Sequence, residues 1–123
     1  MRNDRYAIIL TADGRVILKH CYPTDGLELK TLQRIVQGPI ETVPAVLDKS
    51  WAGEDDVDEI LLIVNEEGKL NGLPVNHNAT DMMQAIYDTI VGNAVLMAAR
   101  GEEIVGLPRK AAENILTKWG LNT

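Results

Sequence analysis

The 123-residue sequence has no phenylalanine, and it contains only one cysteine, one serine and two histidines. With 4% aromatic and 46% hydrophobic residues, its core must be aliphatic, and the chain is too apolar to be disordered. A single cysteine excludes an intramolecular disulfide. The sequence also lacks a secretory signal and the run of about 20 apolar residues that crosses a membrane. We therefore expect one cytoplasmic globular domain over residues 1–123 that contacts no membrane.

Positive charge is scarce as well. Lys and Arg number 12 against 18 Asp and Glu, which gives a formal net charge of −6. A broad nucleic-acid-binding surface requires the opposite sign, so we expect none. Much of the negative charge falls in residues 54–59, which lack the glycine and the terminal glutamate of an EF-hand calcium loop. We interpret that run as a solvated loop, with a partner-facing acidic patch as the alternative.

Apolar runs of β-branched and aliphatic residues predict the strands. Tyr6–Thr11 and Arg15–Lys19 flank an Asp-Gly turn, which predicts an N-terminal antiparallel hairpin. The run Ile60–Val64 is continuously apolar, so we place it in the centre of the sheet with both faces covered. Weaker strand signals lie at three further places: Ile40–Val43, a returning strand at Lys69–Leu70, and Asn93–Ala98.

Helical spacing of apolar residues predicts a first helix over Leu27–Gln37. Asp25 and Glu28 form an acidic version of a capping box at its start. Gly38, which is followed by proline, ends the helix because glycine readily takes the left-handed cap conformation.

Two further helices are predicted in the second half of the chain. One covers Ala79–Asp88 with Asn78 as its cap. The other has Pro108 at its first position and Gly120 as its C-cap. The fold class is therefore α+β: an antiparallel or mixed sheet of about four to five strands, starting with the N-terminal hairpin and packed with about three helices, the last one C-terminal.

The residues that familiar catalytic motifs need are missing. The only Gly-Lys pair is followed by leucine instead of the Ser or Thr of a P-loop, and Ser50 lacks a nucleophile elbow. Cys21 directly follows His20, so on a strand the two side chains point to opposite faces, and a dyad of Cys21 with His77 needs tertiary proximity. Structural zinc takes four Cys or His ligands, and this chain has three in total. We expect a non-enzymatic protein with no cofactor and no metal.

The most unusual segment is the stretch of residues 65–80, which is dense in Asn, Gly and Pro. Its candidate binding residues are Asn65, Asn71, Asn76, Asn78 and Thr80. A loop of this kind presents amide and backbone donors to a ligand, but the same residue types are also ordinary turn formers. If the segment is a recognition surface, alanine at Asn76 and Thr80 weakens binding and leaves thermal stability nearly intact.

Four motifs along the chain resemble a known family. They are, in order, Ile40-Glu-x-Val-Pro44, Asn65-Glu-Glu-Gly-Lys-Leu70, Gly72-Leu-Pro-x-Asn76 with Ala79-Thr80, and Ile90-Val-Gly-Asn-Ala94. This order is similar to that in a family of small domains of unknown function found in phages, plasmids and bacteria that carry mobile elements. The resemblance runs from Tyr6 to about Ala98 and leaves out the helix beyond Gly106. The familiar family variant at Asn93 is an aspartate, and no catalytic residues come with the resemblance.

The resemblance implies a small binder or inhibitor of host machinery. Our leading hypothesis is a non-enzymatic accessory domain that recognises a protein or a small ligand through residues 65–80. The alternative is an anti-defence protein that sequesters a nucleotide signal or inhibits a host nuclease. A third hypothesis is a cryptic enzyme that uses Cys21 or His77. The hairpin edge or the helix that carries Trp119 offers a surface for a homodimer.

Overall fold

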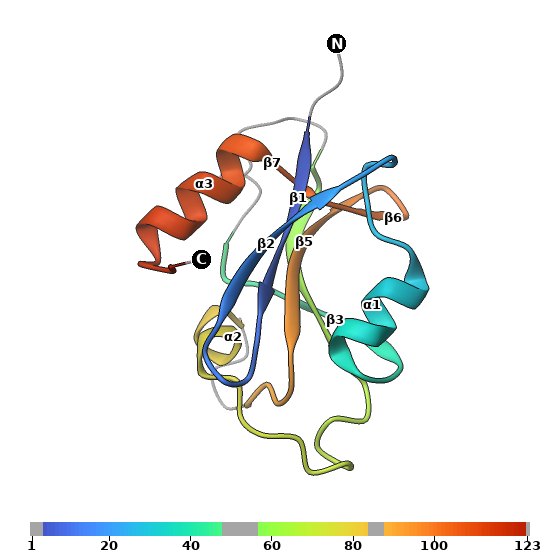
Figure 1. The fold of residues 1–123 in the computed structure, drawn as a ribbon, viewed down its shortest axis with the longest axis vertical. Coiled ribbons are helices and arrows are strands. Elements are labelled where there is room, and N and C mark those ends of the chain that lie inside the picture. The colour runs from blue at the N-terminus through green and yellow to red at the C-terminus, as the bar shows by residue number, and fades with distance from the viewer. Residues whose placement is uncertain (1–3, 48–56, 84–87, 123) are drawn as a thin grey trace.

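The computed structural model describes residues 4–47, 57–83 and 88–122 (Figure 1). This part of the chain contains seven strands and three helices. The strands are β1 (Arg5–Leu10), β2 (Val16–Cys21), β3 (Ile40–Pro44), β4 (Glu59–Asn65), β5 (Ala94–Arg100), β6 (Glu103–Val105) and β7 (Leu107–Pro108). The helices are α1 (Leu29–Val36), α2 (His77–Met82) and α3 (Arg109–Lys118). None of these helices is long and apolar enough to span a lipid bilayer.

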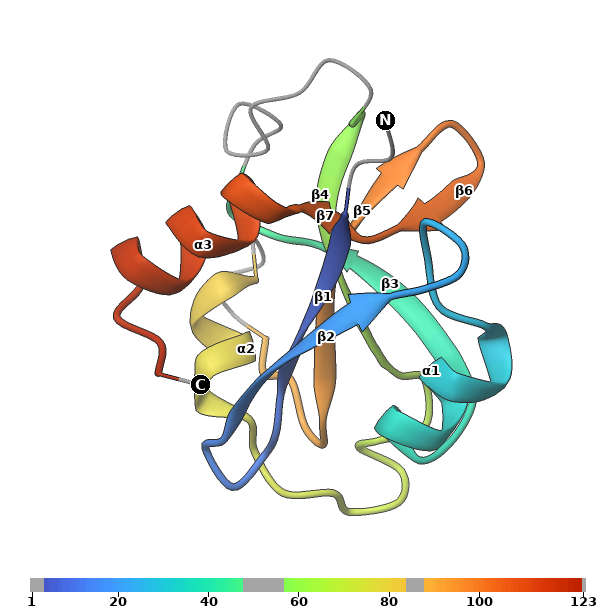
Figure 2. The same cartoon turned by 45° about the horizontal axis from the view of Figure 1, so that its top comes forward.

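All strand pairs are antiparallel, and the main path of the sheet runs β2-β1-β5-β4-β3. β6 pairs with β5, and β7 pairs with β1. The β5–β6 hairpin lies at one end of the molecule, and the loop that follows β4 lies at the other (Figure 2). The centre of the sheet is thus β5, which comes late in the chain and joins β1 to β4.

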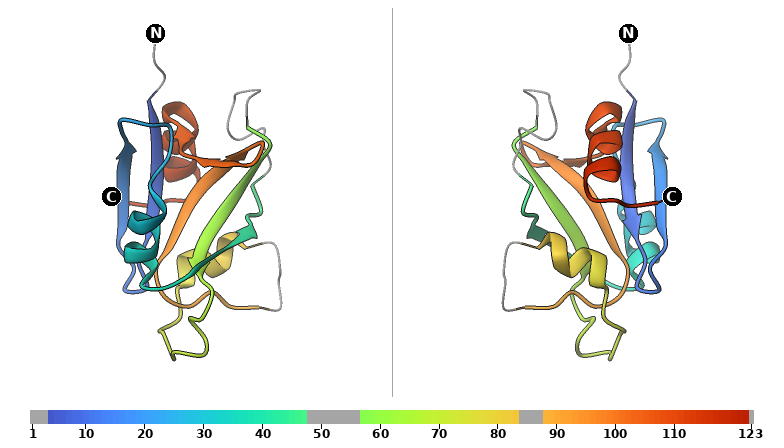
Figure 3. Two further views of the ribbon diagram at one scale, coloured as in Figure 1. Left: turned by 90° about the vertical axis from the view of Figure 1, so that its right-hand side faces the viewer. Right: turned by 90° about the vertical axis from the view of Figure 1, so that its left-hand side faces the viewer.

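The core has two layers because both faces of the sheet are covered. On one face, Ile8 and Leu10 pack with residues of α2 and α3; on the other, Ala7 and Ile9 pack with residues of α1. Figure 3 shows α1 and α3 on opposite sides of the sheet. This alternation along β1 follows from the period of two that a strand imposes on its side chains.

Several predicted elements are confirmed. The N-terminal hairpin forms as an antiparallel pair in which Ile8 lies opposite Leu18. β4 is buried from Ile60 to its end and has a strand on each side, as its continuous apolar run predicts, although the central position expected for it belongs to β5. The α+β class and the C-terminal position of the last helix are also confirmed.

The number of strands was predicted too low. The structure has seven instead of four to five, because β6 and β7 contain only three and two residues and carry no apolar run of their own. The returning strand expected at Lys69 and Leu70 is wrong, since both residues lie in a series of turns. Residues 54–56 of the acidic run 54–59 lie outside the described residues.

The ends of α1 differ from the prediction. The helix begins two residues later than expected, after Glu28, whose side chain makes no capping hydrogen bond. Asp25 instead pairs with Arg100, with 3.1 Å between carboxylate and guanidinium. The left-handed residue at the C-terminus is Gln37 with φ 67°, not Gly38. Gly38 is needed for another reason, because a Cβ there would lie 2.7 Å from Nδ2 of Asn65.

The other two helices also begin elsewhere than predicted. α2 is capped by Asn76, whose Oδ1 accepts a hydrogen bond from the Ala79 amide at 3.0 Å, so Asn78 lies inside the helix. α2 ends at Met82, and the predicted continuation through residues 84–87 lies outside the described residues. Pro108 is the N-cap of α3 rather than its first residue, because it also belongs to β7.

Candidate functional site

Asn76 holds three parts of the fold together from inside the predicted binding loop. Its side chain is 0% exposed. Besides capping α2, its Nδ2 donates hydrogen bonds to the carbonyls of Leu10 and Gly92, each at 2.8 Å. The amide group therefore joins the end of β1, the segment before β5 and the start of α2, and its hydrogen bonds are made within the protein.

Asn65 and Thr80 have comparable internal partners. Asn65 is buried at the end of β4, where its Nδ2 donates to the carbonyl of Val36 at 2.9 Å and its Oδ1 accepts from the amide of Glu67 at 2.7 Å. The hydroxyl of Thr80 accepts from the amide of Ile90 at 2.9 Å. These contacts fix the C-terminal end of α1 and the segment that follows α2.

The remaining two predicted binding residues lie nearer to solvent. Asn71 is exposed in the turns after β4, and Asn78 is half-buried in α2. The structure thus separates the five candidates into three that tie the fold together and two that present side chains outward. Asn93 belongs with the first group, since its Oδ1 accepts from the amide of Ala12 and its Nδ2 donates to the carbonyl of Ile35, both at 3.0 Å.

A small pocket lies at the base of this loop. Its volume is about 120 Å³, and its walls include Asn65, Lys69, Asp88 and Ile90. Lys69 donates a hydrogen bond to Asp88, which lowers the pKa of that carboxyl. Ligand pockets usually measure about 300–1,000 Å³, so this pocket is too small for a drug-sized ligand.

A larger groove lies between β2 and α1, and we call it the β2–α1 groove. It has a volume of about 580 Å³ and is lined by Ile9, Ile17, Leu18, Lys19, His20, Thr31, Arg34 and Ile35. It exists because α1 packs over β3, β4 and β5 and leaves β2 uncovered. As a result, the side chain of Ile17 is 40% exposed although it is a large aliphatic residue in a strand.

The register of the hairpin determines which side chains of β2 face the groove. Ile17 lies opposite Ile9, and Lys19 lies opposite Ala7. Ile9 and Ala7 pack on the α1 side of the sheet. Because directly opposed residues of an antiparallel pair share a face, Ile17 and Lys19 point to the same side and form part of the groove wall.

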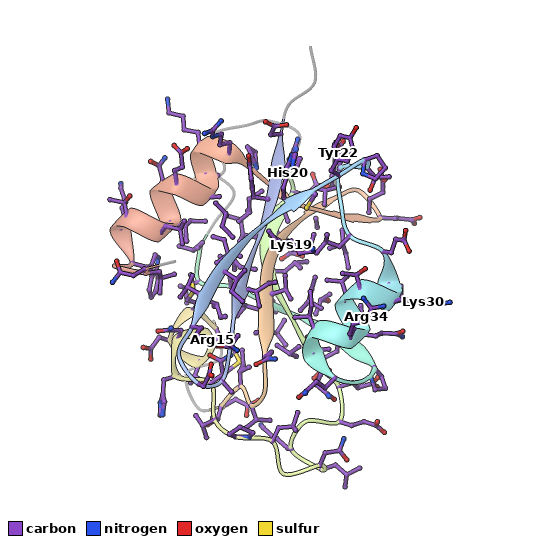
Figure 4. The ribbon with its side chains drawn as sticks, in the orientation of Figure 1. Arg15, Lys19, His20, Tyr22, Lys30 and Arg34 are labelled. Atoms are coloured by element: carbon purple, nitrogen blue, oxygen red, sulfur yellow. The ribbon has the colours of Figure 1, made fainter. Side chains whose placement is uncertain are left out.

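Cationic side chains stand along this groove. Lys19 comes from β2 and Arg34 comes from α1, and both line the groove, whereas Lys30, one turn before Arg34, points outward from α1 and away from β2 (Figure 4). Among residues 4–47, 57–83 and 88–122, no carboxylate lies within ion-pair distance of these three side chains. Arg15, at the turn before β2, pairs with Asp13 at 3.3 Å. The groove therefore combines an apolar floor with positive charge in a protein of net charge −6.

The surroundings of Cys21 and His20 do not favour the roles of nucleophile and base. Cys21 is 1% exposed, and burial raises the pKa of its thiol to about 11, so little thiolate is present at neutral pH. The ring of His20 stacks on Tyr6 with centroids 5.0 Å apart, and its Nε2 lies 3.3 Å from Asp4. No group of three or more potential metal ligands occurs within the described ranges.

The comparison with protein families matches residues 7–120 to a domain of unknown function, DUF3846. The chain belongs to the DUF3846 family. No curated protein matches it, and no solved structure matches it. The match extends beyond the segment from Tyr6 to Ala98 in which the resemblance was expected, and it includes α3. The helix beyond Gly106 is therefore part of the DUF3846 domain.

Reasoning from the sequence missed the β2–α1 groove of this DUF3846 domain. Its residues come from two separate segments that lie side by side only after β2 and α1 have both packed. A partial signal was present, because Lys30 and Arg34 are one helical turn apart and α1 contains no acidic residue. On a chain with an excess of carboxylates, that local reversal of charge was the available clue.

Proposed function

We propose that this protein is a non-enzymatic accessory domain of phage or mobile-element type that binds a protein or a small ligand, and that the β2–α1 groove is its principal contact surface. One observation carries the proposal: an open groove of about 580 Å³ joins exposed Ile17 to Lys19 and Arg34. An exposed apolar strip rimmed by charge is typical of a binding site. We also propose a cytoplasmic location.

The loop of residues 65–80 remains a second contact surface under this proposal. Its tip carries Leu70, which is 83% exposed, next to exposed Asn71. Recognition through this loop then depends on its tip, because the polar atoms of Asn65, Asn76 and Thr80 already make hydrogen bonds within the protein.

Site-specific photo-crosslinking tests the proposal. A photoreactive benzoylphenylalanine replaces Thr31 in the groove, Asn71 at the loop tip, or Thr117 on the exposed side of α3 as the control. Each protein is incubated with lysate of the source organism and illuminated. We expect a discrete adduct from position 31 and none from position 117. Equal labelling from all three positions, or no adduct at position 31, contradicts the groove as the contact surface.

Native mass spectrometry addresses the nucleotide alternative. Cyclic and linear nucleotides are added to the wild-type protein and to a groove variant in which Lys19→Glu is combined with Arg34→Glu. A nucleotide adduct of the wild type that the groove variant loses supports sequestration of a nucleotide signal. Absence of any adduct, together with a protein crosslink at position 31, supports the accessory binding domain.

A further inference from the structure

β2 is an edge strand, and its free edge borders the β2–α1 groove. It pairs with β1 on one side only. The side chains of Leu18 and His20 point to the face opposite Ile17 and Lys19, yet all four residues line the groove. Leu18 and His20 therefore line the groove where it meets the free edge of β2.

The backbone of β2 leaves donors and acceptors available at this edge. The amide of Thr11 donates to the carbonyl of Arg15 at 2.9 Å, so these opposed residues form a hydrogen-bonded pair. Bonded and non-bonded pairs alternate along an antiparallel ladder. Ile17 and Lys19 consequently bond to β1, whereas the amide and carbonyl groups of Leu18 and His20 point away from it. An extended chain can pair with groups oriented in this way.

The side chains around the edge indicate which extended chain fits. Ile9, Ile17 and Ile35 give the groove an aliphatic floor, and Lys19 and Arg34 stand above it without carboxylate partners among the described residues. This arrangement complements a segment that carries an aliphatic anchor next to Asp or Glu. A single-stranded nucleic acid fits less well, because its bases stack on aromatic rings. The floor of the groove is aliphatic, and the rings of His20 and Tyr6 stack on each other on the opposite face of the hairpin. Pairing with a second β2 would bring like charges together.

We propose that the β2–α1 groove binds an extended acidic peptide of a partner protein by strand addition to β2. The main chain of the peptide bonds to Leu18 and His20, an aliphatic side chain enters between Ile17 and Ile35, and its carboxylates pair with Lys19 and Arg34. This proposal rests on the proposed binding function and specifies the chemistry of the partner.

Display selection with short random peptides tests the chemistry. Three immobilised proteins are compared: the wild type, the groove variant, and a charge-matched control that combines Arg109→Glu with Lys110→Glu on α3. The wild type and the control select peptides rich in Asp or Glu beside aliphatic residues. The groove variant binds those peptides with an affinity that is lower by about tenfold or by a larger factor. Selection of neutral or basic peptides by the wild type, or equal binding to the groove variant, overturns the proposal.

Hydrogen exchange of the complex tests the strand addition. The amides of Leu18 and His20 become protected when a selected acidic peptide is bound, whereas those of Ile17 and Lys19 are already bonded to β1 and change little. Protection confined to other elements overturns the proposal, as does preferential binding of oligothymidine over every selected peptide. If no acidic peptide is selected while position 31 still crosslinks to a protein, the binding function stands and its acidic-peptide form is wrong.

Discussion

The loop of residues 65–80 and the β2–α1 groove differ in how their polar groups are used. In the loop, amides concentrated in one stretch of sequence turn inward, and Asn65 and Asn76 bond to distant carbonyls. In the groove, cationic groups from two separate segments point outward and have no carboxylate partner among the described residues. In this protein the polar residues that are concentrated in one stretch of sequence make hydrogen bonds inside the fold. The exposed groove is formed by charged residues that are far apart in the sequence.

The largest effect should come from the centre of the loop. Replacing Asn76→Ala removes three buried hydrogen bonds and leaves two carbonyls and one amide without their partner. We expect the free energy of unfolding to fall by about 3 kcal/mol, measured by urea denaturation. The matched change Asn71→Ala, at the exposed tip, should alter it by less than about 0.5 kcal/mol. If both substitutions lowered the free energy of unfolding by the same small amount, Asn76 would not stabilise the fold more than the exposed tip of the loop does.

This expectation reverses the sequence-based one, in which alanine at Asn76 spares stability. Turn chemistry and ligand binding use the same residue types, so the sequence alone could not separate them. Local signals succeeded where neighbours decide the structure, as in the hairpin at Asp13-Gly14 and the apolar run of β4. They failed for contacts between residues far apart in the chain. Examples are the hydrogen bond of Asn76 to Leu10, the ion pair of Asp25 with Arg100, and the position of α1 beside β2. The groove depends entirely on contacts of that second kind.

A smaller effect is expected where the loop meets α1. Asn65→Ala should cost about 2 kcal/mol, because the carbonyl of Val36 loses its donor. Gly38→Ala is destabilising in the wild type, since the new Cβ meets the Asn65 amide at 2.7 Å. In the double variant the truncated side chain leaves room, so the two costs should fall short of additivity by about 1 kcal/mol. Strictly additive costs would show that the two positions do not touch.

Cys21 lies at the boundary between the groove and the core. Its side chain is on the same face of β2 as those of Ile17 and Lys19, but it is buried. Burial raises the pKa of its thiol from 9.0 to about 11, so the folded protein keeps a proton that the unfolded chain releases. Stability from this group is therefore complete below pH 9 and is lost as the pH rises towards 11. We expect a loss of about 1 kcal/mol near pH 10, measured by urea denaturation at several pH values. Cys21→Ala should flatten that dependence, and an unchanged slope would mean that other groups cause it.

The smallest effect on stability should come from the groove itself. The groove variant, Lys19→Glu with Arg34→Glu, breaks no ion pair of the described residues, so its free energy of unfolding should change by less than about 0.5 kcal/mol. Its binding should nevertheless be the most strongly affected. A large loss of stability would mean that Lys19 and Arg34 stabilise the fold, as the buried asparagines of the loop do.

The place of β5 in the chain has a consequence for the synthesis of the protein. β5 is the central strand, and Ile8 of β1 pairs with Leu96 within it. Until the ribosome has released β5, the hairpin of β1 and β2 and the pair of β3 and β4 have no strand to join them. Pairings between such distant residues form slowly. The nascent chain therefore exposes the apolar faces of two incomplete half-sheets, and chaperones have their main opportunity to bind it in that interval.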